Sequence, residues 1–308
     1  MKLLVTGATG FIGMHFCDEM RRQGHQLILI SRNCNTSIEF NENVYWIQSS
    51  LDLSTVTLNL IEYLKPEILV HLAWQDIPDF SKEKSQKNLE DQIHFFNNLI
   101  SLKSIKRIIV SGSCWEYGDT MGLCSEDNDI SPLNYFIWAK KSLHKYLNII
   151  CDENNIELVW LRFFYVYGPG QKQSSLIPSL FLKLVKNEKP IILSPYDSND
   201  FIYIDDLINA IKLVVLKDKI SGIINIGSGK SIPIIEILKL IEIELFSKIN
   251  YAKSIEENQK STINVKNFWA DILKAKDELC WVPLISMKDG IKKYKNHIQN
   301  YDYFKNAI

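Results

Sequence analysis

The strongest constraint in this sequence is a set of three closely spaced glycines near the start of the chain. Residues 2–6 form a short apolar run, Gly7, Gly10 and Gly13 follow, and a helical pattern extends from Phe11 to about Gln23. The first glycine permits a tight turn, the second lets a ligand approach the backbone, and the third lets the helix pack closely on the strand. Free N–H groups at the start of a helix attract anions. The pattern therefore predicts a turn that binds the pyrophosphate of a dinucleotide; the alternative is a glycine-rich turn without a ligand.

Short apolar runs alternate with helical patterns over the first half of the chain. Such runs are typical of buried parallel strands, and right-handed crossovers between them give a doubly wound sheet with helices on both faces. We predict an α/β fold: a doubly wound parallel sheet of the Rossmann type with a smaller, interleaved α/β substrate lobe. The expected strands are 2–6, 26–30, 44–47, 68–72, 107–110 and 157–163, and the expected helices include 11–23, 81–103 and 136–150.

The pattern changes after Gly168-Pro169-Gly170. We therefore predict a dinucleotide-binding Rossmann domain over residues 1–168, with late strands returning near 200–228, and a mainly substrate-binding lobe over residues 169–308. Residues 299–308 are expected to form a frayed tail. The expected helices of the second part are 175–187, 205–216, 233–246 and 286–298.

Composition argues against several classes of function. The net charge is −1, so no basic surface for nucleic acid or an anionic membrane is expected. No apolar run reaches the roughly 18 residues of a membrane span, and the start of the chain does not resemble a signal peptide. The six cysteines and six histidines show no metal-ligand spacing. We expect no metal, reduced thiols and a cytoplasmic location.

The end of the second strand indicates which dinucleotide binds. It reads Ile30-Ser31-Arg32-Asn33, without the carboxylate that takes the ribose 2′-hydroxyl of NAD. Ser31 and Arg32 suit a 2′-phosphate, since guanidinium pairs well with phosphate oxygens. We therefore expect NADP, with NAD as the alternative cofactor and a solvated surface side chain as the alternative for Arg32. Asp52 is expected to meet the adenine amino group, unless it is a plain loop aspartate.

Further segments carry a family resemblance over about residues 1–295, in order. They are Thr6–Gly13, 51–53, His71-Leu72-Ala73-Trp74, 161–171, 200–206, 225–229 and 279–283. The chain resembles the extended short-chain dehydrogenase/reductases that act on nucleotide sugars, also described as the NAD-dependent epimerase/dehydratase family. Residues 71–74, 111–118 and 163–171 are most similar to the branch that contains dTDP-6-deoxy-L-talose 4-dehydrogenase. That branch interconverts a 4-keto and a 4-hydroxy deoxyhexose carried on a nucleotide.

The resemblance implies two sets of binding residues. The cofactor-binding set is Gly7, Thr9, Gly10, Phe11, Ile12, Gly13, Ser31, Arg32, Asp52, Leu53, Leu72, Ala73, Trp74, Lys140, Phe163 and Val166. The substrate-binding set is Ser113, Cys114, Trp115, Tyr165, Ser175 and Leu176.

Family chemistry also requires a Ser or Thr, a Tyr and a Lys. The resemblance implies that Ser113 steadies the substrate oxygen and that Lys140 lowers the pKa of the phenol and holds the nicotinamide ribose. The phenol is expected one turn before Lys140, on the same helix face. That position is Phe136, although Pro132 has the usual offset from it, so the catalytic position is present and its hydroxyl is missing. Tyr135 faces about 140° away around the helix.

Three interpretations of Phe136 remain open. It is an engineered Tyr→Phe change, or a displaced acid such as Tyr135 or Tyr165 supplies the proton, or the protein binds cofactor and sugar without turnover. Two other departures concern the substrate. Cys114 and Trp115 replace the Asp-Glu pair of the family's dehydratases, so dehydration is not expected. Asn199 replaces an Arg that grips the substrate diphosphate in many members, and Lys172 is a candidate substitute.

We therefore expect an NADP-preferring oxidoreductase that acts at C4 of a nucleotide-linked 4-keto-6-deoxyhexose, in the synthesis of a surface polysaccharide such as an O-antigen. The alternatives are a nucleotide-sugar 4-epimerase and a non-catalytic subunit that binds cofactor and sugar. A homodimer is also expected, because in the family the helices corresponding to 81–103 and 136–150 pair with their copies. Ile93, Phe96 and Ile100 fall on one apolar face there; the alternative is that they pack only on their own sheet.

Overall fold

Seven parallel strands form the central sheet of the computed structural model, which describes residues 1–33, 43–128, 130–258 and 265–299. Their order across the sheet is β10-β7-β5-β4-β1-β2-β3, so the chain winds outward from β1 in both directions. The strands are β1 (Lys2–Thr6), β2 (Gln26–Ser31), β3 (Val44–Gln48), β4 (Ile68–His71), β5 (Arg107–Ser113), β7 (Glu157–Phe163) and β10 (Gly222–Ile226).

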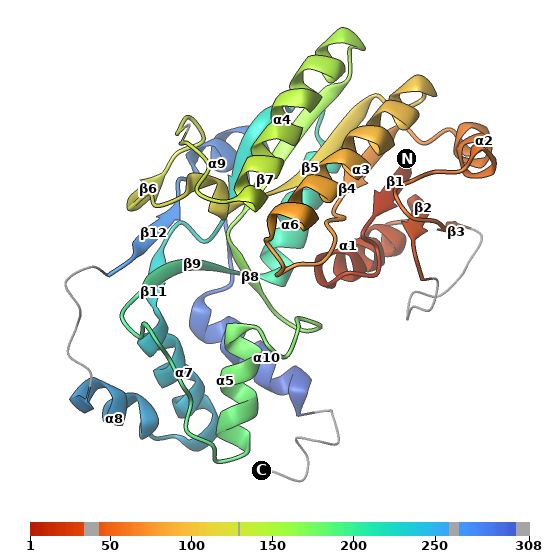
Figure 1. The fold of residues 1–308 in the computed structure, drawn as a ribbon. Helices are drawn as coiled ribbons and strands as arrows, with labels where there is room; N and C mark the ends of the chain where they lie inside the picture. Colours follow the sequence, from red (N-terminus) through yellow and green to blue (C-terminus); the bar gives the residue numbers. More distant parts are fainter. Residues whose placement is uncertain (34–42, 129, 259–264, 300–308) are drawn as a thin grey trace.

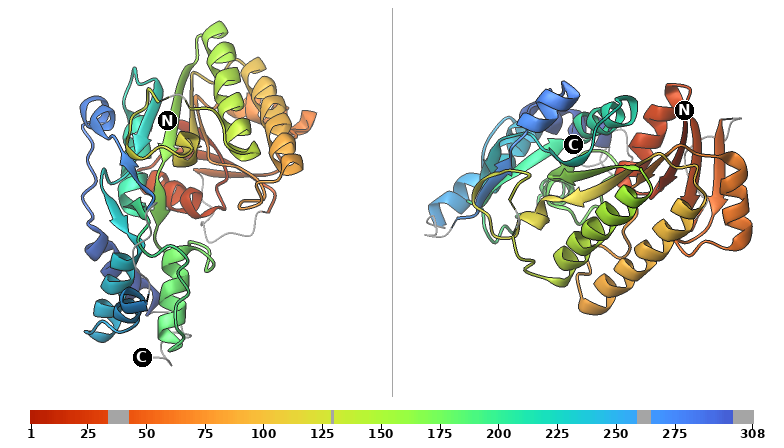
Figure 2. Two further views of the ribbon diagram at one scale, coloured as in Figure 1. Left: turned by 60° about the vertical axis from the view of Figure 1, so that its left-hand side comes forward. Right: turned by 90° about the horizontal axis from the view of Figure 1, so that it is seen from above.

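Helices cover both faces of this sheet (Figures 1 and 2). Leu3 and Val5 of β1 join one apolar cluster with Phe16, whereas Leu4 joins a second cluster with Phe95. Because successive side chains of a strand leave on opposite faces, strands covered on both sides become continuous apolar runs. The first face carries α1 (Phe11–Arg22) and α6 (Ile204–Leu216), and the second carries α2 (Thr55–Leu64), α3 (Lys82–Ser101) and α4 (Tyr135–Glu153).

A smaller mixed sheet lies beside the carboxyl ends of the central strands (Figure 1). Its order is β11-β9-β12-β6, and β8 pairs with β9. Its strands are β6 (Gly122–Cys124), β8 (Tyr165–Tyr167), β9 (Ser198–Tyr203), β11 (Ser231–Pro233) and β12 (Asn267–Ala270). The remaining helices are the 3-10 helix η1 (Cys114–Tyr117), α5 (Leu176–Val185), α7 (Ile234–Phe246), α8 (Tyr251–Asn258), α9 (Leu273–Leu279) and α10 (Met287–Ile298).

The predicted fold class is confirmed: a doubly wound parallel sheet with a smaller, interleaved lobe. The interleaving is visible in β6, an early strand that joins the small sheet, and in β10, a late strand that joins the large one. The sequence did not predict β6, β8, β11, β12, α8 or α9. The domain boundary at residue 168 stays a prediction, and most of the expected tail, residues 300–308, lies outside the described residues. In the described part of the chain, no helix combines the length and apolarity needed to cross a bilayer.

The apolar stripe on α3 belongs to the core. Phe96 is 0% exposed and Ile100 is 7% exposed, both in the cluster beneath α3, and Ile93 packs against that cluster. The prediction that these residues form a free dimer face is therefore wrong. The sheet beneath the helix already covers them.

Asp200 fastens the smaller sheet to the turn after β10. Its Oδ1 accepts hydrogen bonds from the backbone N and Oγ of Ser228, each at 2.6 Å. Its Oδ2 accepts from the backbone N of Gly229 at 2.9 Å and of Ala270 at 3.1 Å. Burial raises the pKa of this carboxyl. One side chain thus joins β9, β12 and the β10–β11 turn.

Replacing Asp200 with alanine should lower the free energy of unfolding by about 3–5 kcal/mol, because several buried donors lose their acceptor together. Urea denaturation measures the change. The control is Asp205→Ala on the neighbouring exposed carboxylate, which forms a surface ion pair with Lys293 at 3.0 Å. Its loss should be about 1 kcal/mol or less. Equal losses of unfolding free energy for the two variants would show that Asp200 does not stabilise the link between the smaller sheet and the turn after β10.

Candidate active site

The turn after β1 leaves no room for side chains. A Cβ on Gly7, whose φ is +72°, would lie 2.8 Å from the backbone N of Ala73. A Cβ on Gly13 would lie 2.0 Å from the carbonyl oxygen of Gly7. Gly10 begins α1 without a side-chain cap, so the first N–H groups of the helix have no side-chain partner there. Such N–H groups bind phosphate.

A pocket of about 210 Å³ opens in front of this turn, walled by the ends of β1, β2 and β4 and by the loop after β3. Its donors fit a dinucleotide, with glycine backbone for a pyrophosphate and hydroxyl and guanidinium groups at the far wall. Among the described residues that line it, none is a carboxylate. The predicted cofactor residues found in its walls are Gly7, Thr9, Gly10, Ser31, Arg32, Leu72, Ala73 and Trp74.

The end of β2 presents Ser31 and Arg32 to this pocket. The Ser31 hydroxyl lies 3.3 Å from that of Thr9, and Arg32 is exposed, with Nη1 donating to Gln75 Oε1 at 3.4 Å. Asp52 does not line the pocket; its side chain is 82% exposed and lies 3.5 Å from the His94 ring. Arg32 is therefore the charged side chain that the pocket offers to a ligand.

Other predicted cofactor residues are placed behind the pocket rather than in its walls. Leu53 and Phe163 are buried in the core. Phe11, Ile12 and Val166 are half-buried against the larger apolar cluster.

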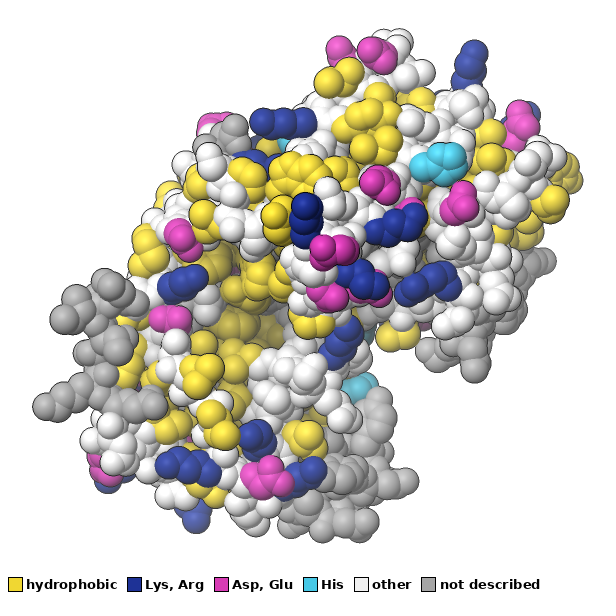
Figure 3. Space-filling model, in the orientation of Figure 1, with side chains coloured by type: hydrophobic (Ala, Val, Ile, Leu, Met, Phe, Trp, Pro, Cys, Tyr) yellow, Lys and Arg dark blue, Asp and Glu magenta, His cyan; other side chains and the backbone are white. Residues whose placement is uncertain are grey.

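A second cavity, of about 460 Å³, lies between η1, the start of α4 and the smaller sheet. Figure 3 shows hydrophobic side chains gathered in a hollow on this side of the molecule. The cavity is lined by three of the predicted substrate residues, Cys114, Trp115 and Tyr165. Its lining does not include the other three, Ser113, Ser175 and Leu176. Ser175 instead begins α5. The residues that sequence reasoning missed are Gly118, Asp119, Thr120, Met121, Leu133, Asn134, Ile137, Lys266 and Phe268.

A cluster of four aromatic rings lies between the pocket and the cavity, with Phe136 at its centre. The centroid of the Phe136 ring lies 5.6 Å from Trp74, 4.8 Å from Phe80 and 6.2 Å from Trp115. Trp74 lines the dinucleotide pocket and Trp115 lines the cavity, whereas Phe136 lines neither. The sequence analysis did not predict that Phe80 belongs to this aromatic cluster. One group of packed rings therefore lies between the two hollows, at the position where a catalytic phenol was expected.

Lys140 is buried one turn after Phe136. Its Nζ donates to the carbonyl oxygen of Ser111 at 2.7 Å and lies 4.2 Å from the centre of the Trp74 ring. Burial lowers the pKa of this amine to about 8, and the Glu116 carboxylate opposes the shift. Tyr135, by contrast, is 48% exposed and lines a separate surface hollow.

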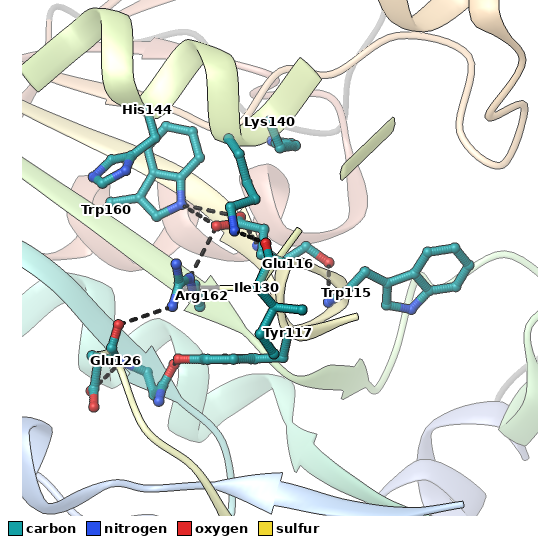
Figure 4. A network of polar contacts seen from close by, with 12 residues as sticks. Trp115, Glu116, Tyr117, Glu126, Ile130, Lys140, His144, Trp160 and Arg162 are labelled. Atoms are coloured by element: carbon teal, nitrogen blue, oxygen red, sulfur yellow. Dashed lines mark hydrogen bonds and ion pairs between the residues drawn. The ribbon is translucent and has the colours of Figure 1, made fainter. Parts of the chain in front are cut away.

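Glu116 is the centre of a buried polar network beneath the site (Figure 4). Its Oε1 accepts from the backbone N of Ser113 at 2.8 Å, and its Oε2 accepts from Arg162 Nε at 3.0 Å. The indole N–H of Trp160 donates to both oxygens at 3.1 Å. The Ser113 hydroxyl accepts from the backbone N of Trp115 at 3.2 Å. Glu116 therefore fixes the turn that carries Ser113.

The residues that reasoning from sequence missed come from distant segments. Glu116 and Arg162 are separated by 46 positions, and Lys266 reaches the cavity because β12 pairs with β9 and β6. Phe80 arrives on the loop before α3. No hydrophobic periodicity links such segments. The sequence did contain one signal for an ion pair, because Glu116 and Arg162 are charged residues in segments that otherwise have the pattern of buried elements. Within the described ranges, no group of three or more potential ligands could hold a metal ion.

Comparison with known proteins identifies the family. Residues 3–227 match the model of the NAD dependent epimerase/dehydratase family, so the chain belongs to that family. It is thus an NAD(P)-dependent enzyme of the kind that modifies nucleotide sugars. It is 31% identical to the dTDP-4-dehydro-6-deoxyglucose reductase of Escherichia coli, over 94% of this chain and 95% of that one.

Two further proteins bear on the branch and the fold. The chain is 27% identical to the dTDP-6-deoxy-L-talose 4-dehydrogenase (NAD(+)) of Aggregatibacter actinomycetemcomitans, over 75% of this chain and 85% of that one. The crystal structure of the UDP-glucuronic acid 4-epimerase of Bacillus cereus in complex with NAD superposes with a TM-score of 0.80 at 26% identity. That match covers 98% of this chain and 97% of the other.

The ionisation of Lys140 should be visible in stability measurements. Its pKa of about 8 in the folded protein lies below the ordinary value of about 10.4, so between the two the unfolded chain binds more protons. The free energy of unfolding should therefore rise by about 1 kcal/mol from pH 7 to pH 9 through this group. Urea denaturation should show that rise diminished in Lys140→Met and kept in Lys145→Met, an exposed control on α4. An identical pH dependence in parent and Lys140→Met would contradict the assignment.

Proposed function

We propose that the protein is an NADPH-preferring reductase of the C4 carbonyl of a nucleotide-linked 4-keto-6-deoxyhexose, in the synthesis of a surface polysaccharide. The observation that carries the proposal is the adjacency of the glycine-lined pocket and the cavity at Phe136. The similarity to a dTDP-4-dehydro-6-deoxyglucose reductase supports this choice within the family. A cytoplasmic location stays a prediction.

In such a reaction, different residues of the chain would bind the cofactor and orient the sugar. The bound dinucleotide supplies the hydride. Gly7, Gly10 and the start of α1 bind the pyrophosphate, Arg32 pairs with the 2′-phosphate, and Lys140 hydrogen-bonds the nicotinamide ribose. Ser113 orients the sugar oxygen. The roles of Lys140 and Ser113 rest on the family resemblance, since neither side chain lines the pocket or the cavity.

The groups that follow Ser113 favour reduction over dehydration. Elimination of water needs a general acid and a base beside the sugar. Here the cavity presents Cys114, whose pKa burial raises well above its ordinary value, and the indole of Trp115. Neither exchanges protons near neutral pH. The substrate is therefore expected to keep its C5 and C6 substituents.

Lys266 is the best-placed partner for the substrate diphosphate. It is the only Lys or Arg among the described residues that line the cavity, and β12 brings the adjoining Phe268 opposite Asn199. Lys172, the candidate from sequence, instead donates to the carbonyl oxygen of Ile77 at 2.8 Å and does not line the cavity.

A homodimer is also proposed, with a corrected interface. The family pairing of α3 and α4 with their copies would use the outer faces of these helices. On that side Tyr135 and Trp138 are exposed and, with Gln86, line a hollow between the helices. Light scattering should give twice the chain mass of 35.7 kDa.

The cofactor preference can be tested through Arg32. NADPH should bind more tightly than NADH, and Arg32→Ala should weaken NADPH binding by about tenfold or more, because a charge-assisted contact to the phosphate is lost. NADH binding should stay nearly constant. Fluorescence titration of both dinucleotides measures this, with Arg22→Ala at the far end of α1 as the matched control. Equal affinity for the two cofactors in the parent would contradict the assignment.

The reaction can be tested through Phe136. Phe136→Tyr should raise turnover, because it places a general acid one turn before Lys140; such a group contributes up to about 10²–10⁴-fold relative to a site that has no acid. NADPH binding should change little. The measurement is stoichiometric oxidation of NADPH with 4-keto-6-deoxy nucleotide sugars. Interconversion of 4-hydroxy sugars without net NADPH consumption would instead indicate an epimerase. Absence of turnover in both parent and variant would favour a subunit that only binds its ligands.

A further inference from the structure

Tyr165 in β8 supplies a second phenol close to the missing one. We propose that Tyr165 donates the proton to the C4 oxygen during reduction. This inference rests on the proposed function. It assigns to Tyr165 a step that the Phe136 ring, which has no hydroxyl, cannot perform.

The hydrogen bonds of Tyr165 leave its proton available. Its Oη accepts a hydrogen bond from Trp115 Nε1 at 3.1 Å. Because an indole N–H only donates, the phenol is the acceptor here and its own proton points elsewhere. The ring is held between Phe201 and Phe268, with centroids 5.4 and 6.1 Å away. The phenol is therefore fixed in the cavity wall, and Trp115 contacts both Tyr165 and Phe136.

The other nearby donors are already engaged or face away. Tyr165 is the only tyrosine among the described residues that line the cavity. Tyr117 is buried and donates its proton to Asn225 Oδ1 at 2.7 Å. Tyr135 lines a separate surface hollow. Lys140 donates to the Ser111 carbonyl oxygen. Lys266 also lines the cavity but is assigned to the substrate diphosphate, so Tyr165 is left as the phenol that a sugar in the cavity can reach.

The step balances as a reduction. C4 gains a hydride, which the bound dinucleotide supplies, as the π bond of the carbonyl breaks. The oxygen takes the proton of Tyr165, so a new O–H bond forms while the phenolic O–H bond breaks. Water entering the open cavity returns a proton to the phenolate.

Burial raises the pKa of the Tyr165 phenol well above its ordinary value, so the group is protonated near neutral pH and enters the reduction as an acid. Because reduction and oxidation share one transition state, the same phenolate would take the proton back in the oxidation of a 4-hydroxy sugar.

Tyr165→Phe tests the assignment because it removes only the hydroxyl. In the parent background it should lower kcat about 10²-fold, with KM nearly constant. Calorimetry on cofactor-free protein should show unchanged binding of dTDP-glucose, and fluorescence titration unchanged binding of NADPH. Tyr135→Phe is the matched control and should behave as the parent. Turnover of Tyr165→Phe equal to that of the parent would overturn the proposal.

Two more variants separate catalysis from structure. Trp115→Phe removes the hydrogen bond but keeps the Tyr165 phenol, so its loss should be much smaller than that of Tyr165→Phe. An equal loss would mean that Tyr165 acts only by holding Trp115, and would overturn the proposal. Phe136→Tyr added to Tyr165→Phe should restore turnover, because it provides the phenol at the other position. Failure to restore it would likewise count against proton donation by Tyr165.

The outcomes also distinguish this inference from the proposed function. If Phe136→Tyr reduces 4-keto sugars while the parent does not, the reductase function stands and the role of Tyr165 fails. If neither reduces any 4-keto sugar, the proposed function itself fails. With a 4-hydroxy sugar and NADP, Tyr165→Phe should slow the formation of NADPH by about the same factor as it slows the reduction, because both directions share one transition state. An undiminished rate in this direction would overturn the proposal.

Discussion

The turn that carries the site depends on one buried carboxylate. Burying a charge costs several kcal/mol unless it is paired and fully hydrogen-bonded, and Glu116 is 1% exposed. Arg162 supplies the opposite charge, and Trp160 and the Ser113 backbone supply the remaining donors. The same interaction therefore stabilises the core and sets the position of Ser113. A change that disturbs the ion pair alters the site even when it lies outside the cavity.

The aromatic cluster explains how the chain accommodates a phenylalanine at the expected phenol position. Contacts between aromatic rings contribute about 0.5–1.5 kcal/mol each beyond the area they bury. Phe136 makes such contacts with Trp74, Phe80 and Trp115, so its ring is well packed without a hydroxyl partner. The proposed proton donor, Tyr165, lines the cavity and accepts a hydrogen bond from Trp115. In this proposal, packing and proton transfer belong to different rings.

The central sheet could be predicted because its strands are buried on both faces and its first turn requires glycine. Local patterns of that kind lie within a few residues of one another. The walls of the cavity could not be predicted, because β6 has three residues and pairs with β12, far along the chain. An amphipathic stripe also does not reveal what covers it, and on α3 the cover is the sheet rather than a second copy. The positions of Tyr135 and Phe136 relative to Lys140 could be predicted from the sequence, because helical spacing fixes which of two neighbouring residues faces Lys140.

The exchange of strands between the two sheets limits how the molecule can move. A hinge between lobes works when one or two linkers cross between them. Here the chain leaves the central sheet to form β6 and returns, then leaves again through β8 and β9, returns as β10 and leaves once more for β11 and β12. Each passage is a covalent tether between the two sheets. Swinging one lobe away from the other would strain all of them, so we expect any adjustment of the cavity around a sugar to come mainly from side chains and short loops at its rim.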